Sequence, residues 1–113
     1  PLAEAPLDPE RHMDLAEVYA GLHRREEAIR AGKRACELRP ESTNPLDNAM
    51  LTMRMVLVYL RLEDADLALQ AIEQSLASPG GLHVGALRVV PIFKPLRNDA
   101  RFQRLLTKYE PRA

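Results

Sequence analysis

One stretch of the sequence, residues 49–62, is apolar around almost its whole helical circumference. It reads AMLTMRMVLVYLRL, and only Thr52, Arg54 and Arg61 interrupt the apolar side chains. A helix that is apolar on nearly every side lies either in the centre of a protein core or in lipid. Fourteen residues with an arginine among them are too short to span a bilayer. We therefore expect a central helix of an all-α domain, packed on two sides by its neighbours, and no membrane segment.

The composition fits one helical domain. A chain of 113 residues can bury roughly two thirds of its unfolded surface. Aromatic residues make up only 4% of the chain, so the core must consist of Leu, Ala, Val, Ile and Met. A single cysteine, Cys36, excludes an internal disulfide and fits a reducing compartment, and we favour a small buried hydrophobe over a reactive thiol. The chain starts at Pro1 without a signal peptide, so we expect a piece of a longer, cytoplasmic protein.

Charge is unevenly distributed, although the net charge is zero. Residues 1–40 carry a net charge of −1, residues 41–81 of −4 and residues 82–113 of +5. The basic end is expected to fold back on the acidic middle. A nucleic-acid surface is the alternative, but no recognition motif or aromatic-basic pattern accompanies the charge.

Local signals divide the chain into helices. Asp8-Pro9 and Asn44-Pro45 each combine an N-cap residue with proline at the first helical position. Pro40 and the segment 78–81 stop helices. The expected helices are 9–22, 26–38, 45–62 and 66–77, a short fifth one within 82–89 that starts near His83, and a sixth that Asp99 caps; residues 1–8 are a linker or frayed end.

The first four helices contain an internal repeat. A shift of forty residues places Val18-Tyr19 on Val58-Tyr59. The same shift matches four further pairs: Leu22 with Leu62, Glu26 with Asp66, Ala28 with Ala68, and Ala31 with Ala71. Helical hairpins that repeat at this period are typical of stacked α-repeat arrays.

The first copy, LAEVYAGLHRREEAIRAGKRACELRP, resembles a tetratricopeptide repeat. Two positions depart from that family, because His12 replaces a bulky aromatic residue and Gly32 replaces a large apolar one. Gly32 is therefore expected where a neighbouring helix or the Tyr19 ring approaches closely. The resemblance implies an α-α superhelix with repeats at about 9–42 and 45–81 and a C-terminal cap at 82–110. It is carried by Leu15, Ala16, Tyr19, Ala28, Ala35 and Pro40, and in the second copy by Tyr59 and Ala68.

The C-terminal third, SPGGLHVGALRVVPIFKPLRNDARFQRLL, resembles the end of tetratricopeptide regions in large bacterial signalling and regulatory proteins. Pro91 and Pro95 favour extended backbone, so residues 89–96 are expected to form an extended strap. Docked on the third and fourth helices, the strap would leave Met50, Met53 and Leu57 as the only exposed apolar patch. The last helix, with its apolar stripe from Phe102 to Tyr109, is expected to cap the stack.

No pattern for catalysis or cofactor binding is found. His12, His23 and His83 lack metal-ligand spacing, and Cys36 has no second thiol, so a zinc site could arise only by accident of folding. Gly80-Gly81 is not followed by the lysine of a phosphate-binding loop. We therefore expect no enzyme, no metal and no cofactor.

The resemblance to tetratricopeptide repeats implies a groove lined by the first helix of each hairpin. A Met-rich apolar groove suits a nonpolar peptide or helix of a partner protein. The strap or another subunit could instead fill it, and the apolar face of the third helix could instead pair two copies of the chain as a homodimer. The expected partner-binding residues are Met13, Glu17, Met50, Met53, Arg54, Leu57, Leu60 and Arg61.

Overall fold

A computed structural model describes residues 8–38, 45–77 and 82–110, and these ranges contain helices without strands. The expected all-α fold is confirmed, and the helix ends agree with the sequence-based ranges to within about two residues. The linker at 1–7, the stop at Pro40, the loop at 41–44 and the stop at 78–81 lie outside the described residues. The elements are α1 (Pro9–Gly21), α2 (Arg25–Glu37), α3 (Pro45–Arg61), α4 (Ala65–Ala77), α5 (Val84–Val89), the 3-10 helix η2 (Pro91–Leu96) and α6 (Ala100–Tyr109).

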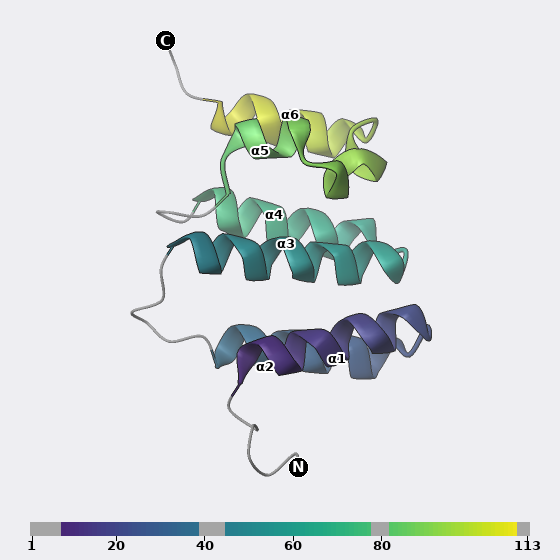
Figure 1. The fold of residues 1–113 in the computed structure, drawn as a ribbon. Coiled ribbons are helices and arrows are strands. Elements are labelled where there is room, and N and C mark those ends of the chain that lie inside the picture. The colour runs from purple at the N-terminus through teal and green to yellow at the C-terminus, as the bar shows by residue number, and fades with distance from the viewer. Residues whose placement is uncertain (1–7, 39–44, 78–81, 111–113) are drawn as a thin grey trace.

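The helices stack in three layers (Figure 1). The first layer pairs α1 with α2, the second pairs α3 with α4, and the third contains α5, η2 and α6. Helix α3 contacts both helices of the first layer and also η2, while α6 packs on α4. The apolar stretch found in the sequence is therefore the central helix, as expected.

Aspartate side chains cap the helices where the sequence predicts it. The Asp8 carboxylate accepts a hydrogen bond from the Glu10 amide at 3.0 Å, and the Asp99 carboxylate accepts one from the Arg101 amide at 2.8 Å. Each cap satisfies an amide that has no partner within its helix, which typically stabilises the helix by about 1 kcal/mol.

The two hairpins turn in the same way. His23 and Glu63, forty residues apart, both have φ of 59°, in the left-handed region. In each turn the next amide donates to the carbonyl oxygen of a tyrosine five residues earlier, Tyr19 or Tyr59, at 2.9 Å. This is the Schellman arrangement that ends many helices. The forty-residue repeat in the sequence is thus a repeat in the backbone.

The first two layers come closest at Gly32. A β-carbon on Gly32 would lie 2.3 Å from Sδ and 2.7 Å from Cε of Met55 on α3. The expected close approach is confirmed, and the neighbour is α3 rather than the Tyr19 ring. Fully buried side chains continue this contact through the stack, among them Met13, Val56, Val58, Ile72, Leu87, Phe93 and Phe102.

Residues 91–96 do not form the extended strap that the prolines predict. They form η2, in which Phe93 N donates to the Val90 carbonyl oxygen at 3.2 Å. A 3-10 helix needs φ close to the value that proline fixes, so its short turns tolerate Pro91 and Pro95. Side chains three residues apart point the same way in a 3-10 helix, and Phe93 and Leu96 both enter the core. The segment still packs against α3, as expected.

Candidate functional site

The face expected to bind a partner is only partly accessible. Met13 is fully buried between α1 and its neighbouring helices, so Met13 offers a partner no surface. Met50 is the most open apolar residue of this face, with 48% of its surface exposed. Farther along α3, Met53, Leu57 and Leu60 are half-buried, and Arg61 is exposed. The accessible part is therefore one row on α3, which we call the α3 row: Met50, Met53, Leu57 and Leu60.

An ion-pair cluster joins α1 to α3 beside the α3 row. Arg54 Nη2 donates to the Glu17 carboxylate at 2.5 Å and to the Asp14 carboxylate at 2.5 Å. The bond to Glu17 is the main reason that the pKa of Arg54 is raised. Sequence reasoning named Arg54 and Glu17 but missed Asp14. The forty-residue repeat could have predicted the contact with Asp14. Asp14 and Arg54 occupy matching positions of the repeat, and the two helices that carry them, α1 and α3, lie side by side.

Elsewhere in the described part of the chain, three further large apolar side chains are exposed. Val18 is 57%, Leu22 60% and Val89 74% exposed. The expectation that Met50, Met53 and Leu57 form the only exposed apolar patch is therefore wrong. The expectation failed because it took only the second layer into account, which η2 and α6 cover. The side of α1 that faces away from α3 has no neighbouring helix within the described residues.

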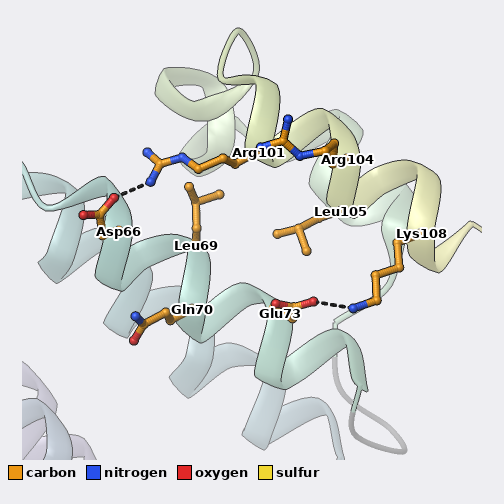
Figure 2. A pocket seen from close by; sticks show the side chains of 8 residues that line it. All are labelled: Asp66, Leu69, Gln70, Glu73, Arg101, Arg104, Leu105 and Lys108. Carbon is orange, nitrogen blue, oxygen red and sulfur yellow. Dashed lines mark hydrogen bonds and ion pairs between the residues drawn. The ribbon is translucent and has the colours of Figure 1, made fainter.

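A shallow hollow of about 600 Å³ lies between α4 and α6 (Figure 2). An ion pair crosses it at each end, Asp66 with Arg101 and Glu73 with Lys108, the second at 2.9 Å. Both pairs join residues thirty-five positions apart, so α4 and α6 run parallel in a fixed register. Leu69 from α4 and Leu105 from α6 lie between the pairs and are buried.

These pairs confirm that the basic end of the chain folds back on its acidic middle. The bond to Lys108 lowers the pKa of Glu73, and the bond to Glu73 raises the pKa of Lys108. Hydrogen bonds to Asp99 and then to Asp66 raise the pKa of Arg101. Because each charged group at the ends of the hollow already has a partner, we interpret this hollow as a clamp that holds α6 on the stack.

The described residues give no support for a metal site. Among residues 8–38, 45–77 and 82–110, no three His, Cys, Asp or Glu side chains gather closely enough to hold a metal ion. In the same ranges, no helix is long and apolar enough to cross a membrane.

No protein-family model matches this chain, and comparison with curated proteins and with solved structures gives no significant match.

Proposed function

We propose that this chain is a non-catalytic protein-interaction module of the tetratricopeptide kind, which binds an apolar peptide or helix of a partner protein along the α3 row. The observation that carries the proposal is the row itself: Met50 is 48% exposed, and Met53, Leu57 and Leu60 continue from it in steps of three and four. Residues at this spacing share one side of a helix and form a continuous stripe.

The chemistry of the α3 row favours an apolar occupant. Methionine side chains are flexible and polarizable, so they adapt to differently shaped apolar partners. Arg54, which lies on α3 beside the row, already donates to Glu17 and Asp14, so its charge is neutralised there. A helix laid in an apolar groove is a common mode of peptide recognition and needs few charged contacts.

The resemblance of the C-terminal third to the ends of bacterial tetratricopeptide regions supports a wider context. We place the module in a large cytoplasmic regulatory or signalling protein of bacteria. Its role there is to hold a partner rather than to catalyse a reaction.

Peptide selection tests the binding proposal. Peptides enriched from a random phage-displayed library on the immobilised chain are resynthesised with fluorescein and titrated by fluorescence polarisation. We expect an apolar consensus, and we expect Met50→Glu and Leu57→Glu to weaken binding more than about fivefold because each places a charge against an apolar contact. Val89→Glu is the matched control, since Val89 is 74% exposed on α5 and should leave binding unchanged. Equal losses in all three variants would contradict the proposal.

The exposure of Met50 also favours a second use of the α3 row, the pairing of two copies of the chain. Solution mass and circular dichroism of Met53→Glu/Leu57→Glu separate the two uses. Loss of a dimer with helicity retained supports self-association, whereas an unchanged monomer leaves a partner protein as the occupant. Unfolding of the variant would show that both residues are core, and neither use of the row would then stand.

A further inference from the structure

The α3 row has carboxylates along one flank. Arg54 lies four residues after Met50 and three before Leu57, so it shares their side of α3. Its two carboxylate partners, Asp14 and Glu17, both belong to α1, which packs beside α3. Asp14 and Glu17 therefore border the row on the side of the first layer.

The forty-residue repeat shows how α1 differs from α3 along this face. A shift of forty residues matches the four members of the row with Glu10, Met13, Glu17 and Ala20. Met13 and Ala20 are fully buried, so the matching positions of α1 that reach the surface are the acidic ones. A partner that lies across both helices meets an apolar surface on α3 and carboxylates on α1.

This flank stays acidic when the cations beside it are counted. Its carboxylates are Asp8, Glu10, Asp14 and Glu17, and its cations are Arg11 and Arg54. Four carboxylates against two guanidinium groups leave a net charge of −2. His12, the other titratable residue of this part of α1, lines a hollow that α1 forms with α2.

Two further cations lie away from this flank. Arg61 follows Met50 by eleven residues, about 16 Å along the axis of α3, which exceeds the screening length of about 8 Å at physiological salt. Lys94 belongs to η2, which packs on α3 from the third layer, whereas α1 packs on it from the first. The row therefore has carboxylates on its first-layer flank and cations at its far end and in the third layer.

Glu10 and Asp14 are open to a partner. The side chain of Asp14 is 69% exposed although it pairs with Arg54, and Glu10 is exposed and has no ion pair within the described residues. One guanidinium group shared by two carboxylates leaves one negative charge uncompensated. Charges at the edge of a contact steer association and set specificity more than they add affinity. Lysine or arginine beside an apolar stripe suits this surface, whereas glutamate there would meet like charge.

We infer that the partner of the α3 row is a basic amphipathic helix, which lays its apolar stripe on the row and sets lysine or arginine side chains beside Glu10 and Asp14. These two carboxylates then select among apolar helices by the sign of the flanking charge. The inference rests on the proposed function, because it needs a peptide on the row, and it adds the chemical class of that peptide.

Two fluorescein-labelled peptides test this by fluorescence polarisation. They share one leucine stripe, which is flanked by lysine in one peptide and by glutamate in the other. The chain has no net charge, so overall attraction favours neither peptide. At low salt the wild type should bind the lysine peptide at least about fivefold more tightly. Glu10→Gln/Asp14→Asn should bring this preference below about twofold, while Glu26→Gln, at an exposed carboxylate on α2, should leave it unchanged.

Salt and a milder variant serve as checks. The preference of the wild type should largely vanish at about 1 M salt, where the screening length is about 3 Å. Glu10→Gln alone breaks no ion pair within the described residues and should already lower the preference, with the circular dichroism spectrum unchanged.

The outcomes separate the inference from the proposed function. Equal binding of both peptides, tighter binding of the glutamate peptide, or the same preference in the wild type and in Glu10→Gln/Asp14→Asn would overturn the inference and leave the proposed function standing. If neither peptide binds, the phage-selected consensus decides: lysine or arginine beside its apolar positions supports the inference, and a neutral or acidic consensus overturns it. An empty selection as well would remove the proposed function, and the inference with it.

Discussion

Replacing Gly32 by leucine tests how closely the first two layers approach. The first added carbon alone would lie 2.3 Å from Sδ and 2.7 Å from Cε of Met55, whereas favourable contacts lie at about 3.5–4.0 Å. Only 4% of the surface of Met55 is exposed, so its end cannot swing into solvent without leaving the core. Gly32→Leu must therefore push α3 away or force Met55 into a new rotamer.

The expected loss can be estimated from two opposing effects. Leucine favours the helix over glycine by up to about 1 kcal/mol. Overpacking of a filled core typically costs about 1–3 kcal/mol, and the remaining carbons of leucine add to the clash. We expect Gly32→Leu to lower the free energy of unfolding by about 1–3 kcal/mol despite the better helix propensity.

Urea unfolding followed by circular dichroism measures this loss. Gly85→Leu is the control, because a β-carbon at Gly85 would meet nothing within 4 Å and the variant should be at least as stable as the wild type. Met55→Ala removes the atoms that clash. It should therefore lower the free energy of unfolding less in the Gly32→Leu chain than in the wild type, with a difference of more than about 0.5 kcal/mol. A Gly32→Leu chain that is as stable as the wild type would refute the expected overpacking, because it would show that Sδ and Cε of Met55 move aside at little cost.

Three further perturbations give distinct outcomes. Tyr59→Ala should lower the free energy of unfolding in urea by about 3–5 kcal/mol, because Tyr59 is 6% exposed. Tyr109→Ala should lower it clearly less, because Tyr109 is half-buried, and equal losses would contradict this placement of the core. His23→Gly relieves a left-handed residue and should add about 0.5–1 kcal/mol, so a lower thermal midpoint would contradict the turn geometry. The pKa of Asp64 is lowered by the hydrogen bond from the Leu67 amide and then by Arg25, and the pKa of Glu73 is lowered by Lys108. These contacts therefore stabilise the fold above the ordinary carboxyl pKa values. Their contribution should be lost as the pH falls through the lowered pKa values, at roughly pH 5 to 2. Urea midpoints that do not change over that range would argue against both contacts.

The helices could be predicted from sequence because their signals are local. Asp8 and Asp99 cap the helices that follow them, and the forty-residue repeat fixed which helices pair. The conformation of residues 91–96 could not be predicted in this way, since proline is compatible with both extended and 3-10 backbone. The choice depends on Phe93 and Leu96, which reach the core together only when they point the same way.

The candidate site was predictable in outline but not in exposure. The resemblance to tetratricopeptide repeats placed Arg54 and Glu17 on one face, and the structure brings them into contact. The burial of Met13 depends on how closely the neighbouring helices approach α1. The spacing of the helices depends on contacts between them, such as that of Gly32 with Met55. It cannot be predicted from the apolar periodicity of a single helix.

The methyl groups of methionine report most directly on the proposed binding face. The chain has four methionines, and two of them, Met50 and Met53, belong to the α3 row, while Met13 and Met55 are buried in the core. A chain labelled with ¹³C at the methionine methyl carbons should give four resolved signals, assigned by substitution of each residue. We predict that a selected apolar peptide shifts the signals of Met50 and Met53 and leaves those of Met13 and Met55 in place. A peptide that saturates the chain without moving the signals of Met50 and Met53 would contradict the account.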